Sequence, residues 1–445
     1  MKKHFCGIRA LNTQLALDMG MNQEKILTAD ELASWQMAQL RATLKHAMQS
    51  PYYAEQLAGT DIDSLKNIAD LAQLPRTEPE ILRTKPFDVL CISQDDVARA
   101  VTYDTSGSTG QPKRLFFAQE DLERTINFFE HGMSTFTPKG AVVMAILPSA
   151  RPSSVGRLLH EGLTRMGATA IVGNPEDGGE ALAKLAYENK VSVIVGSPWH
   201  VRSLALAWAE LAYTKDCIHT VLYCWDTVGP AMDTLLADTL GCTVRHHWGM
   251  TETGLGGALS CGYEGLHIRE ADLLVEIVEP NTGTPVADGE WGELLVTTLG
   301  RRAMPLIRYA TGDRARILAA PCPCGSPMRR LDRVLGRIDD EAMLPNGETL
   351  RMMDIDAALL PIKEIVHYEA KYLDIEPAVL QLSLYYKVYP STNMHTLQKN
   401  IGSALNSIQC TQYDLTMHTL SIEASLSQVI PQGMTFAKRR IHIEY

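Results

Sequence analysis

The sequence lacks any long hydrophobic run. Hydrophobic residues make up 45% of the 445 residues, but no uninterrupted apolar stretch approaches the roughly 18 residues that a transmembrane helix requires. The first residues, MKKHFCGIRALNTQ, include lysines but neither the apolar segment nor the small-residue cleavage site of a signal peptide. We therefore expect a soluble, cytoplasmic protein that has no membrane partner.

The sequence also lacks an excess of positive charge and a paired pattern of cysteines. Its 41 basic and 52 acidic residues give a net charge of -11. Nucleic acids and anionic membranes are bound by basic surfaces, so we expect neither as a partner. The nine cysteines are scattered and odd in number, which argues against a disulfide framework. A chain of this length is expected to hold two or three domains.

The spacing of apolar residues predicts an α/β fold. Residues 28–90 have helical spacing, and Thr28 is placed to cap a helix. Short apolar runs then alternate with helical segments, which predicts buried and largely parallel strands. The runs are residues 141–147, 169–172, 191–196, 220–225 and 243–248, and the helical segments include residues 178–189 and 198–211. Residues 270–318 read as antiparallel strands with a turn at 280–283.

A segment rich in glycine and hydroxyl groups, YDTSGSTGQPK, ends at Lys113. Glycines let the backbone approach an anion, successive N–H groups can surround it, and the hydroxyls and lysine add donors for phosphate oxygens. Pro112 stands where a Walker A loop has glycine, so this is a different motif. A flexible linker would not need the Pro-Lys end and the apolar strand that follows. The predicted phosphate-binding residues are Ser106, Gly107, Ser108, Thr109 and Gly110.

Three further segments follow along the chain. They are Trp248-Gly-Met-Thr-Glu-Thr253, Arg308-Tyr-Ala-Thr-Gly-Asp313 and Gly336-Arg-Ile-Asp-Asp340. An aromatic face suits a purine, a carboxylate suits a hard cation, and an aspartate can accept two hydrogen bonds. Taken alone, a core tryptophan, a solvated glutamate and an aspartate in a turn would also explain the first two segments.

Together these segments resemble the adenylate-forming superfamily, and within it the phenylacetate-CoA ligase family most. The resemblance implies a large N-terminal adenylate-forming domain (residues 1–336) with parallel sheets and a β-rich subdomain. It implies a small, mobile α+β C-terminal domain (residues 337–445). It also implies that the protein uses ATP and Mg²⁺ to activate a small carboxylic acid, aryl or related, and passes the acyl group to coenzyme A. The sequence leaves open whether the chain forms a homodimer.

The resemblance implies a role for each matching residue. Trp248 would stack on adenine, Thr251 would contact the α-phosphate, and Glu252 would hold Mg²⁺. The implied role of Asp313 is to bind the ribose hydroxyls, and that of Arg337 is to lie near the nucleotide. The catalytic set implied is Lys113, Thr251, Glu252 and a C-terminal lysine, which Lys438 matches best.

A compact Cys322-Pro-Cys324-Gly segment is a candidate metal site, because two thiolates at this spacing can share one ion. Cys261 and His267 stand upstream. Some relatives in the family resemble this chain in both segments, which implies a structural Zn²⁺ site formed by these three cysteines and His267. The alternative is a set of reduced cysteines, since Cys-x-Cys is less specific than paired Cys-x-x-Cys.

Three departures from the family pattern leave alternatives open. The segment after the predicted hinge, residues 341–350, lacks the Arg-Gly stretch of the family, so the acceptor could differ from coenzyme A. The terminal lysine match leaves open a decayed, nucleotide-binding regulatory protein, although Lys113 and Glu252 are intact. The loop at residues 148–156 is polar and carries Arg151. Either the acid carries a second polar or anionic group, or Arg151 serves pyrophosphate or the surface.

Overall fold

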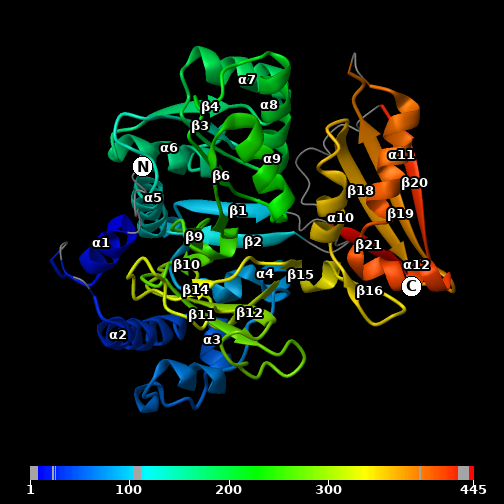
Figure 1. The fold of residues 1–445 in the computed structure, drawn as a ribbon. Coiled ribbons are helices and arrows are strands. Elements are labelled where there is room, and N and C mark those ends of the chain that lie inside the picture. The colour runs from blue at the N-terminus through cyan, green and yellow to red at the C-terminus, as the bar shows by residue number, and fades with distance from the viewer. Residues whose placement is uncertain are drawn as a thin grey trace. The chain divides into compact units, whose positions relative to one another are not determined.

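The fold is seen in a computed structural model that describes residues 9–22, 25, 27–103, 112–389, 392–428 and 440–444 (Figure 1). The chain forms two compact units: unit 1 comprises Met1–Val172 and Arg245–Val334, and unit 2 comprises Gly173–Val244 and Leu335–Tyr445. Parallel strands alternating with helices, together with several antiparallel sheets, confirm the predicted α/β class.

Unit 1 begins with helices that have well-defined starts. The predicted cap at Thr28 is confirmed, because its Oγ1 accepts a hydrogen bond from the Glu31 N–H at 3.2 Å while Glu31 Oε2 accepts from the Thr28 N–H at 3.0 Å. Pro51 begins a further short helix, since proline is tolerated in the first helical turn. The helices of this unit are α1 (Arg9–Asp18), α2 (Ala29–Ala47), α3 (Pro51–Gln56), α4 (Ile81–Thr84), α5 (Gln119–Ser134) and α6 (Val155–Arg165).

The strands of unit 1 form mainly antiparallel pairs. Strand β1 (Arg99–Tyr103) pairs with β2 (Lys113–Phe117), and β11 (Leu273–Val278) pairs with β12 (Gly292–Thr298), which pairs with β13 (Tyr309–Ala315). A second group has the order β14 (Arg330–Leu331), β10 (Leu266–Ile268), β9 (Ala258–Ser260) and β8 (His247–Trp248). Strands β3 (Val142–Ile146) and β4 (Thr169–Gly173) are neighbours in a further sheet. The antiparallel region predicted between residues 270 and 318 is confirmed.

The run at residues 243–248 was expected to be one strand, and this expectation is wrong. The chain forms β7 (Thr243–Arg245) and then β8, which belong to different sheets. Between them, the backbone N–H of His246 donates to Ser260 Oγ at 3.1 Å. The His246 carbonyl accepts from the Ser260 N–H at 3.0 Å, so both backbone groups of His246 are bonded to Ser260 where the chain passes from one sheet to the next.

Unit 2 contains helices that alternate with parallel strands and a separate C-terminal sheet. Its first part comprises α7 (Gly179–Glu188), β5 (Val193–Gly196), α8 (Pro198–Glu210), β6 (Thr220–Tyr223) and α9 (Pro230–Leu240). Strands β5 and β6 pair in parallel, from Val193↔Thr220 to Gly196↔Tyr223. The helices predicted at residues 178–189 and 198–211 are confirmed as α7 and α8.

The C-terminal part of unit 2 is built on a four-stranded sheet. Its order is β20 (Leu420–Ser427), β19 (Ala378–Tyr386), β18 (Ile365–Leu373) and β21 (Ile441–Glu444). Apolar residues of α10 (Met352–Leu359) and α11 (Met394–Leu405) join those of the strands in one core (Figure 1). The remaining elements are β15 (Gly336–Arg337), β16 (Ala342–Met343), β17 (Thr349–Leu350) and α12 (Gln412–Met417).

Arg202 of α8 joins the two parts of unit 2. Its buried guanidinium donates to the backbone oxygens of Ile365, Leu360 and Ile362 at 2.7, 2.9 and 2.9 Å. These carbonyls follow α10, so the arginine supplies donors to the end of that helix. Removing either part of the unit would therefore leave buried polar groups without partners.

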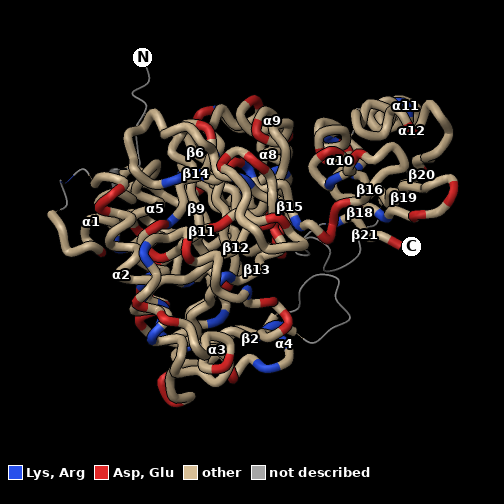
Figure 2. The backbone as a smooth tube through the Cα atoms, turned by 90° about the horizontal axis from the view of Figure 1, so that it is seen from below, with Lys and Arg blue, Asp and Glu red and all other residues tan. Residues whose placement is uncertain are grey.

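The described residues show neither a region of one charge sign nor a long apolar helix, in agreement with the composition of the chain. Acidic and basic residues are interspersed along the described backbone (Figure 2). Among the described residues, no helix is long and apolar enough to cross a membrane.

Candidate active site and metal cluster

A buried network of three polar side chains lies in unit 1. Lys113, the first residue of β2, donates from Nζ to Glu252 Oε1 at 3.0 Å and to the Tyr309 hydroxyl at 2.7 Å. The Tyr309 hydroxyl in turn donates to Glu252 Oε1 at 2.9 Å. Two predicted catalytic residues, Lys113 and Glu252, are thus brought together from positions 139 residues apart.

This network is a strong electrostatic feature because water is excluded from it. The side chains of Lys113 and Glu252 are each only 2% exposed. Two charges leave water at a large cost, which their attraction offsets only when geometry and further hydrogen bonds are good. The Tyr309 hydroxyl provides such bonds to both partners. A buried pair of this kind is typical of a site that handles charged ligands.

The backbone around Glu252 is also held in place. Glu252 lies in the short helix η5 (Thr251–Thr253), which places the predicted phosphate contact Thr251 directly beside it. The buried Arg301 donates from Nη1 to the Glu252 carbonyl at 2.6 Å and lies over the ring of Phe117 at 4.9 Å. Arg301 therefore links the turn that carries Glu252 to the strand that begins with Lys113.

The sequence-based assignment missed Tyr309 and Arg301. Tyr309 lies inside the predicted Arg308–Asp313 segment, where a tyrosine between an arginine and the Thr-Gly-Asp end was the available signal. The strand is fixed on both sides of it, because the Thr77 N–H donates to the Arg308 carbonyl and the Ala310 N–H donates to the Thr77 carbonyl. Arg301 lies outside all the predicted site segments.

A second pair of predicted residues meets near the same turn. The indole Nε1–H of Trp248 donates to Asp313 Oδ2 at 2.9 Å, and both residues are buried. Trp248 lies in β8 and Asp313 in β13, so the predicted adenine platform and the predicted ribose ligand come together. The tryptophan in place of the family's tyrosine supplies this N–H donor.

The structure places the other predicted site residues as follows. Arg337 lies in β15 near the start of the C-terminal segment of unit 2. Arg151 is exposed in the loop after β3. The predicted loop residues Ser106, Gly107, Ser108, Thr109 and Gly110, and the predicted catalytic Lys438, lie outside the described residues.

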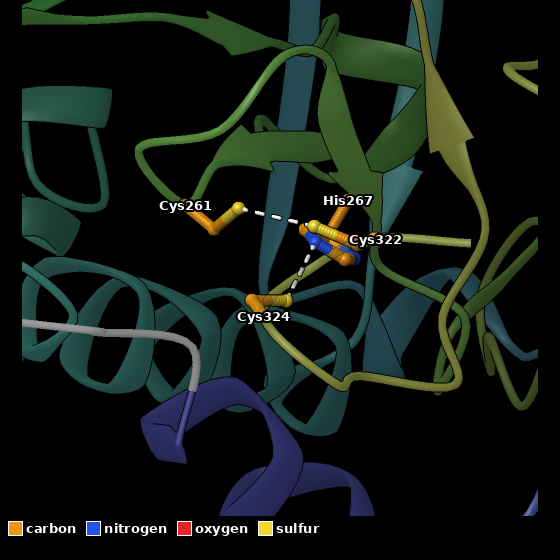
Figure 3. A group of neighbouring side chains, drawn as sticks. All are labelled: Cys261, His267, Cys322 and Cys324. Carbon is orange, nitrogen blue, oxygen red and sulfur yellow. Dashed lines mark hydrogen bonds between the residues drawn. The ribbon is translucent and has the colours of Figure 1, made fainter. Parts of the chain in front are cut away.

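A separate cluster contains all four predicted zinc ligands (Figure 3). The ligand atoms of Cys261, His267, Cys322 and Cys324 all lie within 4.8 Å of one another. Cys261 Sγ is 3.6 Å from Cys322 Sγ, and Cys324 Sγ is 3.3 Å from His267 Nε2. Tetrahedral zinc with cysteine and histidine ligands separates its donor atoms by roughly 3.5–3.8 Å, so the arrangement fits such an ion.

The surroundings of this cluster also fit a metal. His267 Nδ1 lies 3.1 Å from the Met328 carbonyl, which assigns the ring proton to Nδ1 and directs Nε2 toward the cysteines. The hydrogen bond from Cys324 lowers the pKa of the Cys261 thiol to about 3, whereas the hydrogen bond to Cys261 and burial raise the pKa of Cys324. One thiolate is therefore favoured even without an ion, and thiolates are the ligands that zinc binds.

The fold and the order of the buried motifs define an adenylate-forming enzyme. The family described as "AMP-binding enzyme" matches residues 26–300. Phenylacetate-coenzyme A ligase of Escherichia coli K12 is 32% identical over 70% of this chain and 72% of that protein. The chain therefore belongs to the AMP-binding enzyme family and is similar to the phenylacetate-coenzyme A ligases in it, as the sequence segments predicted.

Two further comparisons support this assignment. Phenylacetate-coenzyme A ligase of Thermus thermophilus is 29% identical over 77% of this chain and 78% of that protein. A 2-hydroxyisobutyryl-CoA ligase, solved in the postadenylation state with an acyl-AMP, superposes with a TM-score of 0.78 at 19% identity, covering 94% of this chain and 91% of that one. At this identity the second comparison concerns the fold alone.

Proposed function

We propose that this protein is an AMP-forming ligase that activates a small carboxylic acid with ATP and Mg²⁺ and transfers the acyl group to coenzyme A. The observation that carries the proposal is the buried network of Lys113, Glu252 and Tyr309, next to the Trp248–Asp313 pair. A nucleotide with its polyphosphate and metal needs an aromatic face, a ribose acceptor, a cation and a carboxylate, and these groups supply them.

The proposed reaction has two steps. A carboxylate oxygen of the acid attacks the α-phosphorus of ATP, a P–O bond forms, and the bond to pyrophosphate breaks. The thiolate of coenzyme A then attacks the acyl carbonyl, and AMP leaves with the bonding electrons of the C–O bond. Mg²⁺ held by Glu252 would offset the negative charges that meet in the first step. Lys113 holds the carboxylate of Glu252 in place, and Thr251 is proposed to contact the α-phosphate.

The experiment that tests this proposal is acid-dependent exchange of pyrophosphate into ATP over a panel of aryl and aliphatic acids, with and without coenzyme A. Exchange with one acid and a thioester on addition of coenzyme A are expected. Exchange without thioester formation would assign another acceptor, as the departure at residues 341–350 allows. ATP binding without any exchange would favour a regulatory protein.

We also propose that Cys261, His267, Cys322 and Cys324 hold a structural Zn²⁺ ion. Four soft or imidazole ligands, with no position left for a substrate, are typical of structural rather than catalytic zinc. The ion would join the end of β9 and strand β10 to the loop before β14, and its most distant ligands, Cys261 and Cys324, are 63 residues apart in sequence. Elemental analysis of the purified protein is expected to find one zinc per chain.

The remaining sequence-based expectations stay predictions. They are the domain division at residue 336, a mobile C-terminal domain, a catalytic Lys438, Arg337 near the nucleotide, and a cytoplasmic location without nucleic-acid or membrane partners. Whether the chain forms a homodimer also stays open. Of these, Lys438→Ala gives the sharpest test. A lysine that acts only in adenylation would slow acyl-adenylate formation and leave thioester formation from added acyl-AMP intact.

A further inference from the structure

His247 lies next to the predicted adenine platform but faces a different part of unit 1. It forms β8 with Trp248, and neighbouring side chains of a strand point to opposite faces. Whereas the Trp248 indole bonds to Asp313, the His247 ring packs near Phe128 of α5, with ring centroids 6.4 Å apart. The side of β8 away from Asp313 is therefore lined by an imidazole and a phenyl ring.

Glycines allow the backbone to close around these two rings. A Cβ atom on Gly249 would lie 2.8 Å from His247 Cε1, and one on Gly256 would lie 2.3 Å from Phe128 Cε1. Neither position can carry a side chain without moving a ring. The positions of His247 and Phe128 are thus fixed by close packing, as a specificity site requires.

The His247 ring has an unused hydrogen-bonding position. Its Nε2 atom is buried and has no hydrogen-bond partner among the described residues. Burial alone lowers the pKa of His247 to about 4, so the imidazole is neutral at pH 7. A buried polar atom without a partner is costly in a folded protein, and it is explained when a ligand supplies the partner.

The acid substrate is the ligand that this position would meet. His247 precedes Thr251 by four residues and Glu252 by five, and these two residues are the proposed contacts of the α-phosphate and its Mg²⁺. The carboxylate of the acid must lie at that phosphate to attack it. A nucleotide on the Trp248 and Asp313 side leaves the His247 side of β8 for the body of a small acid.

We propose that His247 is a specificity-determining residue that hydrogen-bonds a hydroxyl group on the carboxylic acid substrate. The proposal rests on the adenylation activity proposed above and names its substrate class. A neutral imidazole has one donor and one acceptor nitrogen, and a hydroxyl group can form a hydrogen bond with either of them. A second carboxylate could only accept a hydrogen bond, and burying its charge beside a neutral imidazole is costly. The buried Phe128 holds the His247 ring in place by close packing.

The test compares matched acids that differ by one hydroxyl group. Suitable pairs are phenylacetate with its ring-hydroxylated forms, and 2-methylpropanoate with 2-hydroxy-2-methylpropanoate. We expect kcat/KM for ATP–pyrophosphate exchange to be about tenfold or more higher for the hydroxylated member of at least one pair. His247→Leu should bring this ratio close to one, mainly by lowering kcat/KM for the hydroxylated acid. His247→Gln, which keeps a donor and an acceptor, should retain part of the preference.

His246→Leu is the matched control. His246 is the adjacent residue, and its ring lies near Arg333 rather than Phe128, so the ratio should not change. Equal kcat/KM within every pair for the unaltered enzyme, or an unchanged preference in His247→Leu, would overturn the inference while leaving adenylation intact. Absence of exchange with every acid would instead overturn the proposed function. Unaltered thermal unfolding and ATP binding in His247→Leu would exclude a folding defect.

Discussion

The two buried clusters of unit 1 are built from neighbouring stretches of chain but differ in what holds them together. The first cluster consists of Lys113, Glu252 and Tyr309. The second consists of Cys261, His267, Cys322 and Cys324. In the first cluster, Lys113 balances the charge of Glu252 and the hydroxyl of Tyr309 bridges them. In the second, three sulfur atoms and an imidazole converge without a cation among the side chains of the cluster.

The first cluster is suited to catalysis and the second to stabilising the fold. The Lys113 network is complete without a ligand, so its geometry is prepared before the substrate arrives. The cysteine and histidine cluster brings together groups that gain stability only when an ion binds them, so its ligand contributes to folding. The comparison therefore predicts that changes in the first cluster act mainly on catalysis and changes in the second mainly on stability.

The largest effect is expected from Lys113→Met. It removes the cation of the proposed site and leaves Glu252 buried without its partner, so exchange should fall about 10²–10³-fold and the free energy of unfolding by about 3–5 kcal/mol. Exchange assays and denaturant unfolding measure the two losses. The double variant Lys113→Met, Glu252→Gln should recover most of the stability and none of the activity. Recovery of activity in the double variant would break the proposed distinction.

Cys322→Ser should have the next largest effect, on stability. Loss of one of four ligands should release zinc and lower the free energy of unfolding by on the order of 3 kcal/mol or more, because the ion binds only the folded chain. Elemental analysis and thermal unfolding measure this. The exposed Cys217 provides a control, since Cys217→Ser should change neither zinc content nor stability. A Cys322→Ser protein of normal stability that retains its zinc would contradict the metal assignment.

His247 is a third kind of buried polar group, because among the described residues its Nε2 atom has neither the charged partner of the first cluster nor the metal ligands of the second. Its pKa is lowered by burial to about 4, against about 6.5 in an unfolded chain. Between these values the unfolded chain binds more protons, so the free energy of unfolding should fall as the pH drops, by up to roughly 3 kcal/mol at pH 4. Unfolding from pH 7 to pH 4 should show a smaller pH dependence in His247→Leu. The exposed His395 is the control position.

Tyr309→Phe is expected to have the smallest effect. It keeps the ring in β13 and removes only the hydroxyl, while the direct bond between Lys113 and Glu252 remains. We expect about a tenfold loss of exchange and about 1 kcal/mol of stability. A loss as large as that of Lys113→Met would mean that the hydroxyl takes part in the chemistry, rather than positioning Lys113 and Glu252.

The parts of this molecule that could be predicted from sequence are those with a local pattern. Apolar periodicity identified the helices and strands, and the short segments around Glu252 and Asp313 identified the family. The break at His246 could not be predicted, because both backbone groups of this residue bond to Ser260, a partner that only the folded chain brings close. Tyr309 and Arg301 were missed for the same reason. Their roles depend on partners that are distant in sequence.

The pairing of β8 with β9 makes the proposed nucleotide and zinc sites thermodynamically linked. Trp248 is opposite Ala258 in this pair, and Cys261 follows the end of β9 directly. An ion that orders β9 also orders the strand that carries the adenine platform, so zinc and nucleotide would act as heterotropic ligands with positive coupling. Linkage is reciprocal, and an enzyme saturated with nucleotide would therefore bind its zinc more tightly than the free enzyme in competition with a chelator at equilibrium.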